Sequence, residues 1–152
     1  MVELASRGIR VALPGGWDGH IYRRAASGVA ETHDVLHAAS FALPPERGDF
    51  GGGAVELMQA DDIFISLFDY GADSAGLPLF AKRSGVPTAL TPDQFDPSAL
   101  QRTLPGQCGT QVFFTTAGRG FCLYVVLGSW RDRVALHHRA NVLLSTVVIG
   151  PS

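Results

Sequence analysis

Short apolar runs separated by glycine and proline dominate the chain, and they predict β-strands. Residues 9–13 and 20–24 are two such runs, and the Pro-Gly-Gly-Trp-Asp-Gly stretch between them predicts a broad turn that joins them as a hairpin. Residues 35–43 predict a third strand, because this run ends at Pro44 and Pro45, which cannot donate to a strand ladder.

The strongest strand prediction is residues 63–70, which are apolar on both alternating faces. A strand of this kind is buried on both sides, so we expect it at the centre of a sheet. The β-rich runs 111–116 and 121–127 flank an Ala-Gly-Arg-Gly turn and predict the clearest hairpin of the chain.

Helical patterns are fewer. Residues 54–60 predict two helical turns, and residues 96–100 predict a single turn that opens with an Asp-Pro cap. The one long helix prediction covers residues 131–147, where apolar positions recur every three or four residues after a cap at Ser129. Between the strands, residues 71–95 predict a long loop with a strand-like fragment near residues 77–80.

This order of elements predicts an α+β fold, an antiparallel sheet with helices packed on it. The chain has 152 residues, of which 46% are hydrophobic and 17% charged. A chain of this size and composition can bury a core without disulfides or metal. We therefore expect a single α+β domain over residues 1–152.

Three motifs follow one another along the chain: Leu-Pro-Gly-Gly-Trp at 13–17, Gly-Arg-Gly at 118–120 leading into 121–125, and Leu-Leu-Ser-Thr at 143–146. In this order they resemble the PsbP/Mog-like superfamily. The resemblance implies an α-β-α sandwich and no shared catalytic residues, since those proteins mostly serve as binding or accessory proteins for larger complexes. The chain departs from the exported members in lacking an export signal, so a bacterial cytoplasmic relative is the closest description.

The charge pattern disfavours two classes of partner. Twelve Lys and Arg residues stand against fourteen Asp and Glu residues, a formal charge of −2, and the basic residues occur in ones and twos. Phosphate backbones need clustered cations, so we expect no nucleic acid and no anionic membrane as partners.

The first residues show no charged segment followed by an apolar one, so a secretory signal is not indicated. The longest apolar stretch, residues 140–149, is too short for a bilayer, which takes about 20 residues. Two cysteines are too few for a disulfide scaffold. These observations predict a cytoplasmic protein with free thiols.

No metal or cofactor motif is present in the sequence. His137 and His138 are adjacent and would point about 100° apart on a helix, which favours a surface pair over a metal site. The glycine-rich residues 48–53 lack the Lys-Ser/Thr pair of a phosphate-binding loop. We expect no catalytic residues, no cofactor and no metal.

The two cysteines have different predicted surroundings. Cys122 lies in the apolar run 121–127 and is expected to be buried and inert. Cys108 lies in residues 105–109, a predicted loop where a thiol is exposed, although no basic neighbour lowers its pKa. We expect no bond between them and identify Cys108 as the candidate reactive thiol.

Trp17 and Phe50 are the candidate partner-binding residues. Trp17 follows two glycines in a turn, and Phe50 lies in the glycine-rich loop 46–53. An aromatic side chain at a turn either folds back over the core or stands exposed as a binding anchor, and the sequence leaves both alternatives open.

Two hypotheses about function follow. The first is a non-enzymatic binding or accessory module that engages a protein partner, or itself, through a sheet edge or the loops beside Trp17 and Phe50. The alternative is a small-molecule-binding protein or enzyme with a pocket between the sheet and the 71–95 loop, using His20, His37 or Cys108.

Overall fold

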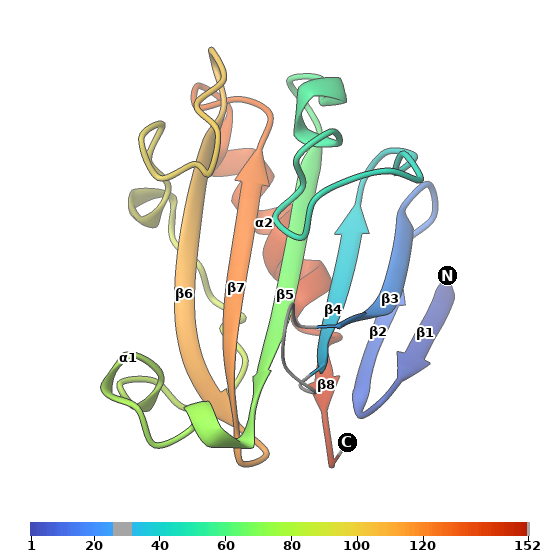
Figure 1. The fold of residues 1–152 in the computed structure, drawn as a ribbon. Coiled ribbons are helices and arrows are strands. Elements are labelled where there is room, and N and C mark those ends of the chain that lie inside the picture. The colour runs from blue at the N-terminus through green and yellow to red at the C-terminus, as the bar shows by residue number, and fades with distance from the viewer. Residues whose placement is uncertain (26–31, 152) are drawn as a thin grey trace.

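The computed structural model describes residues 1–25 and 32–151, and its largest element is a five-stranded antiparallel sheet (Figure 1). In spatial order the strands are β3 (Asp18–Ala25), β4 (Thr32–Ala39), β5 (Ile63–Gly71), β7 (Arg119–Leu127) and β6 (Cys108–Thr116).

A smaller antiparallel sheet joins the two ends of the described chain. It consists of β1 (Val2–Ser6), β2 (Ile9–Leu13) and β8 (Val148–Ile149), with β2 in the middle. Ile9 pairs with Ile149, and the Gly150 amide donates to the Gly8 carbonyl at 2.8 Å.

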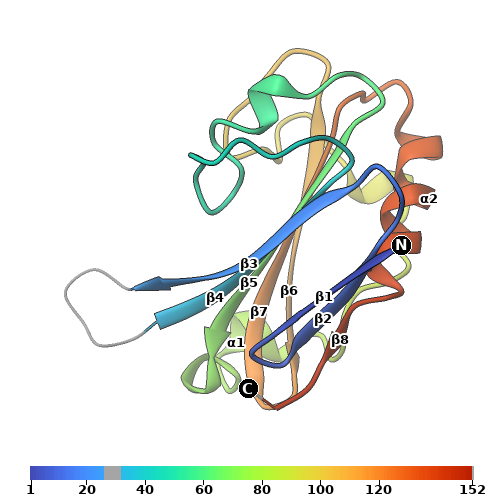
Figure 2. The same cartoon turned by 90° about the vertical axis from the view of Figure 1, so that its right-hand side faces the viewer.

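Helices are short apart from α2 (Arg133–Leu144). The others are α1 (Pro78–Ala81) and the 3-10 turns η1 (Val55–Leu57), η2 (Ala72–Ser74) and η3 (Pro92–Gln94). In Figure 2, α2 and the small sheet lie against one face of the large sheet, while residues 41–60 and α1 lie on the other. The fold is therefore a sheet-dominated mixture of α and β structure.

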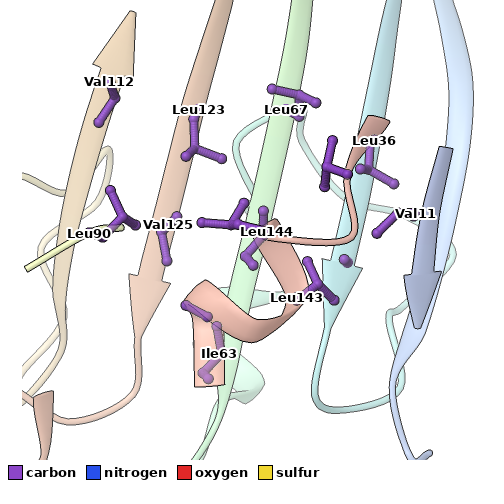
Figure 3. Packing of buried hydrophobic residues seen from close by; sticks show 14 of the residues in the cluster. Val11, Leu36, Ile63, Leu67, Leu90, Val112, Leu123, Val125, Leu143 and Leu144 are labelled. Atoms are coloured by element: carbon purple, nitrogen blue, oxygen red, sulfur yellow. The ribbon is translucent and has the colours of Figure 1, made fainter. Parts of the chain in front are cut away.

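The main core lies between the large sheet and the layer formed by α2 and the small sheet. Leucines of α2 pack there against β-branched and leucine side chains of the strands (Figure 3). Ile63, Ile65 and Val125 from the sheet and Leu143 and Leu144 from α2 are all at most 1% exposed.

Two strand predictions are confirmed. Strand β5 is the central strand of the large sheet, and its first seven residues are buried. Strands β6 and β7 form the expected hairpin, with Ala117 and Gly118 at φ values of 50° and 73°. Positive φ at both positions is the geometry of a type I′ turn, whose twist matches the strands.

The first predicted hairpin is wrong. Residues 9–13 pair with β1 and β8, and β3 pairs with β4 instead, with His20 opposite His37. The two-residue turn at Arg7 and Gly8, both with positive φ, joins β1 and β2 as a tight hairpin. The broad turn at residues 14–17 connects β2 to β3 without pairing them.

Two short predictions are also wrong. Residues 77–80 are not a strand, because Pro78 starts the helix α1 at a position where its missing N–H costs nothing. Residues 96–100 are not helical: Asp96 forms a bridge with Gly109, and its side chain accepts the Ser98 amide at 2.7 Å. The helix predicted for residues 131–147 exists but covers only 133–144.

Among the residues that the structure describes, no helix has the length and apolar character needed to span a membrane.

Candidate functional site

One face of the large sheet is covered only in part. Residues 41–60 cross its upper half, and η2 with α1 flank its lower end (Figure 2). Beside η2 and α1 on this face lies a hollow of about 600 Å³, which we call the apolar groove. Its lining residues come from β4, β5, β6 and the η2–α1 segment: His33, Tyr70, Asp73, Ser74, Leu77, Leu79, Phe80 and Phe113.

The rim of the groove carries exposed apolar side chains. Leu77 and Leu79 keep 52% and 50% of their surface exposed, although both lie beside a buried residue, Phe80. Because each leucine is half exposed, the chain forgoes about half of the 1.5–3 kcal/mol that full burial of a leucine side chain contributes. Such a patch on a small protein is typical of an interaction surface.

A row of aromatic rings runs along this face of the sheet, and three of them, Tyr70, Phe80 and Phe113, form the floor of the groove. Phe50 stacks on Phe68 at 5.8 Å, and Phe68 contacts Tyr70 at 4.6 Å between ring centroids. Tyr70 then contacts Phe80, and Phe80 meets Phe113 edge-on at 5.6 Å. Aromatic pairs at these distances hold one another in place, so the floor is preformed.

The position of α1 depends on Gly120 in β7. The Gly120 amide donates to the Ser74 hydroxyl at 3.1 Å, and the Ser74 hydroxyl donates to the Gly71 carbonyl at 2.7 Å. A Cβ on Gly120 would collide with the Ser74 oxygen and would lie 2.8 Å from the Phe80 ring. The missing side chain therefore lets η2 and α1 dock against the sheet.

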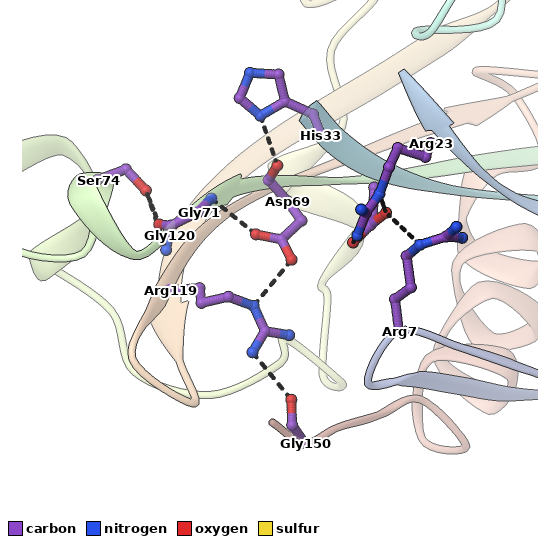
Figure 4. A network of polar contacts seen from close by, with 10 residues as sticks. Arg7, Arg23, His33, Asp69, Gly71, Ser74, Arg119, Gly120 and Gly150 are labelled. Carbon is purple, nitrogen blue, oxygen red and sulfur yellow. Dashed lines mark hydrogen bonds and ion pairs between the residues drawn. The ribbon is translucent and has the colours of Figure 1, made fainter. Parts of the chain in front are cut away.

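A buried ion pair lies on the opposite face of the sheet, behind the strand that carries Tyr70 (Figure 4). Arg119 donates to Asp69 at 2.9 Å and to the Gly150 carbonyl at 3.0 Å, and Asp69 also accepts the Gly71 amide. His33 donates from Nδ1 to the Asp69 carbonyl at 3.1 Å, which leaves its Nε2 as an acceptor at the groove.

The groove continues to the free edge of the sheet. A second hollow of about 300 Å³, the edge hollow, shares Leu79 and Phe113 with the apolar groove. Its other lining residues are Lys82, Arg83, Gln94, Thr110, Gln111 and Val112. The two hollows together form one surface that runs from the sheet face over β6 to its outer edge.

A separate polar network holds residues 46–50 on the sheet around the fully buried His37. Arg47 Nε donates to His37 Nδ1 at 2.8 Å, and His37 Nε2 donates to the Asp49 carbonyl at 2.7 Å. Ser66 donates to the same carbonyl, and Tyr22 donates to the Asp49 carboxylate at 2.6 Å. Because Nδ1 accepts a bond, His37 is the neutral tautomer with its proton on Nε2.

Burial controls the titration of this network. It lowers the pKa of His37 to about 4, and the neighbouring Arg47 charge adds to the effect. Burial and the hydrogen bond to Asp49 raise the pKa of Tyr22. Both side chains therefore stay uncharged near neutral pH, and the network positions the loop without offering a general base.

Trp17 and Phe50 do not form one surface. Trp17 is half-buried and packs against the main core, which favours the alternative in which it folds back over the core. Phe50 is also half-buried, but it packs on the opposite face of the sheet through Phe68 and Tyr124. Phe50 does not line the apolar groove, but it is connected to it, because it stacks on Phe68, which contacts the lining residue Tyr70.

The predicted exposure of Cys108 is wrong. Cys108 is the first residue of β6, opposite Leu127, and it is fully buried, as is Cys122. Burial raises the pKa of both thiols to about 11. Both cysteines are free, which confirms that no disulfide joins them. The β-ladder starts earlier than the sequence indicated, because Gly109 pairs on its outer side with Asp96.

The histidines named by the sequence lie apart from the groove. His20 lines a different hollow of about 550 Å³ beside Tyr22 and Arg47, and His37 is enclosed by the loop. His137 is buried, whereas His138 is exposed. Within residues 1–25 and 32–151, no three His, Cys, Asp or Glu side chains cluster as metal ligands. The residues that matter most, Leu77, Leu79 and Phe113, were missed because their exposure depends on tertiary packing.

Comparisons with known proteins add no relative: no family model, no curated protein and no solved structure matches this chain.

Proposed function

We propose that the protein is a non-enzymatic binding module that holds an apolar segment of a protein partner in the apolar groove. The observation that carries this proposal is the exposure of Leu77 and Leu79, 52% and 50%, over a hollow floored by aromatic rings. Burying these side chains against a partner recovers the free energy that the isolated chain forgoes.

The composition of the groove supports a protein partner. Tyrosine and phenylalanine give large contact areas at low cost in side-chain entropy, and they are enriched at the centres of protein interfaces. Polar groups are few: the Nε2 acceptor of His33 and the exposed carboxylate of Asp73 lie at the groove. These groups orient a partner segment at the rim of an apolar centre.

Several finer expectations belong with this proposal. The primary occupant of the groove is a protein partner, and the second is another copy of this chain. Of the two sequence candidates, Phe50 is the one connected to the groove, through Phe68 and Tyr70. An antiparallel sheet with a C-terminal helix on one face fits a PsbP/Mog-like accessory protein. Two free thiols fit the reducing cytoplasm.

The second candidate is a small-molecule-binding protein or enzyme that uses the same groove. One observation favours it: the hollow does lie between the sheet and the start of the 71–95 segment. Against an enzyme, the lining Ser74 hydroxyl donates its proton to the Gly71 carbonyl and accepts the Gly120 amide, so it is not hydrogen-bonded to a base that would activate it. We therefore rank this candidate lower.

Affinity purification of the tagged chain from its own cells, followed by binding measurements with each purified co-purifying protein, tests the proposal. Leu79→Glu is expected to weaken binding of the true partner by about tenfold or more, because it places a charge in an apolar interface. Val142→Glu is the matched control, since Val142 is 62% exposed on α2, away from the groove.

A partner whose affinity is unchanged by Leu79→Glu, or equally weakened by Val142→Glu, would overturn the proposal. Light scattering after size exclusion tests the self-association alternative. A dimer of the wild type that becomes a monomer only with Leu79→Glu would identify a second copy as the occupant.

A further inference from the structure

The outer edge of β6 is paired at both ends and open in the middle. At one end, the Gly109 amide and carbonyl both bond to Asp96, at 3.0 and 2.9 Å. At the other end, the Thr115 amide donates to the Arg83 carbonyl and the Thr115 carbonyl accepts the Gly85 amide, both at 2.9 Å. The chain itself thus supplies a short neighbouring strand on each side of a gap.

The gap exposes backbone groups that can bind another strand. Along a strand, alternate residues direct both their N–H and their C=O to the same side. Since Gly109 and Thr115 point outward, Gln111 and Phe113 also point outward. In the described part of the chain no group pairs with the outward N–H or C=O of Gln111 or Phe113. Four hydrogen-bonding groups therefore face the edge hollow.

The size of the gap limits its occupant. Six residue steps separate Gly109 from Thr115, and at about 3.3 Å per residue the paired ends lie roughly 20 Å apart. The flanking residues Asp96 and Ser84 occupy part of this length. An extended segment that pairs through about three residues fits between them.

Charge and apolar surface define the chemistry of that segment. Lys82 and Arg83 line the edge hollow and are exposed, and neither forms an ion pair with any residue in the described ranges. Residues paired with Gln111 and Phe113 would direct their side chains to the face of Phe113 and Leu79, which is apolar. A second copy of this edge would bring the same cations together, which disfavours self-pairing.

We propose that an extended peptide segment of a partner adds as a strand to β6 at Gln111 and Phe113, with apolar side chains on the Phe113 face and an acidic residue near Lys82 and Arg83. Main-chain hydrogen bonds give this mode its affinity, and alternate side chains give it specificity. The inference rests on the proposed binding function and names the form of its occupant.

Amide hydrogen exchange of the free protein tests the open edge first. The amides of Gln111 and Phe113 are expected to exchange much faster than those of Gly109 and Thr115, which are bonded on the same edge, and those of Thr110 and Val112, which face β7. Protection of Gln111 and Phe113 equal to that of Gly109 and Thr115 would overturn the inference.

The probe for binding is a blocked peptide of sequence Thr-Val-Glu-Val-Thr. Its binding is measured from the shifts of the Gln111 and Phe113 amide resonances and by calorimetry. Methylation of both Val nitrogens, which lie on the pairing side, is expected to weaken binding about tenfold or more. Methylation of the Glu nitrogen, on the opposite side, is expected to leave the affinity nearly unchanged. Equal loss from both peptides, or no binding at millimolar peptide, would contradict strand addition.

Charge reversal tests the acidic preference. Lys82→Glu with Arg83→Glu is expected to weaken binding of this peptide and to strengthen binding of its Lys-containing counterpart, while Arg131→Glu at the exposed start of the α2 region changes neither. Equal responses of the two peptides would refute the role of Lys82 and Arg83.

The two proposals can fail separately. A partner that is sensitive to Leu79→Glu but leaves exchange at Gln111 and Phe113 unchanged would support the groove and overturn strand addition. A peptide that passes the methylation test together with a partner that is insensitive to Leu77→Glu, at a residue that lines the apolar groove but not the edge hollow, would support strand addition and overturn the groove.

Discussion

Arg119 donates from Nε to Asp69 Oδ2 across 2.9 Å, and these two side chains are only 8% and 5% exposed. The pair joins the end of β5 to the start of β7 and, through the Gly150 carbonyl, to the residue after β8. Its surroundings exclude water, so neither charge can be removed without leaving the other unpaired.

Asp69→Asn is therefore expected to destabilise the protein by about 3–5 kcal/mol, because the buried Arg119 charge loses its partner. Denaturant unfolding measures the change. Glu3→Gln is the control, since Glu3 and Arg10 form a pair that is 61% and 62% exposed and should contribute almost nothing. Equal stabilities of the two variants would show that the buried pair is not structural.

Stability should fall in mild acid because of His37. Its pKa is about 4 in the folded protein and about 6.5 in an unfolded chain, so between these values only the unfolded state binds the proton. Stability is then highest above pH 6.5 and is lost as the pH falls towards 4, by on the order of 3 kcal/mol. Unfolding curves across this range measure it.

His37→Gln removes the titrating group and should flatten the stability profile between pH 6.5 and 4, whatever its effect at neutral pH. The other charged or polar groups that face His37 are Arg47, Asp49, Tyr22 and His20. These groups are still present in His37→Gln. If the free energy of unfolding changes with pH equally in the wild type and the variant, the effect comes from these groups and not from His37.

Thiol titration should find no fast-reacting cysteine in the native protein. Cys108 and Cys122 are both fully buried and burial raises the pKa of each to about 11, so thiolate is scarce and reagent is excluded. Both thiols are expected to react at once in denaturant. A single fast thiol in the folded protein, which the sequence predicted for Cys108, would contradict the buried position of that residue.

The turn between β6 and β7 can be improved. Ala117 has a φ of 50°, a conformation that costs an alanine about 1 kcal/mol, and asparagine before glycine is the preferred type I′ pair. Ala117→Asn should therefore raise the free energy of unfolding by up to about 1 kcal/mol. Ala75→Asn, outside the turn, serves as a control in the same denaturation experiment, and an equal gain there would count against this explanation.

Local signals in the sequence predicted part of this fold. The doubly apolar run at 63–70 predicted the central strand, and the Gly118 turn predicted the β6–β7 hairpin. Residues 9–13 carry an equally clear strand signal, yet their partners lie at residues 2–6 and 148–149. Alternation identifies a strand but not its neighbour, because pairing depends on distant chain segments.

The candidate site shows the same limit. A pocket beside the 71–95 segment was one of the sequence hypotheses, and a hollow does lie there, but His20, His37 and Cys108 are elsewhere. From the sequence alone, an apolar residue such as Leu79 is expected in the core. Only the packing of α1 shows that it is exposed. No pattern in the sequence predicts the open edge at Gln111. The gap is defined by two distant residues, Asp96 and Ser84, which pair with β6 on either side of it.

The small sheet also constrains the order of assembly. Strand β2 pairs with β8 on one edge, and the Ala12 amide donates a hydrogen bond to the Thr146 hydroxyl oxygen at 3.1 Å. During synthesis on the ribosome, residues 2–13 emerge long before residues 148–149, the second neighbour of β2. Until then one edge of β2 is unpaired, so this sheet cannot be completed before residues 148–149 have been made, and its open edge can mispair with other nascent chains in the interval.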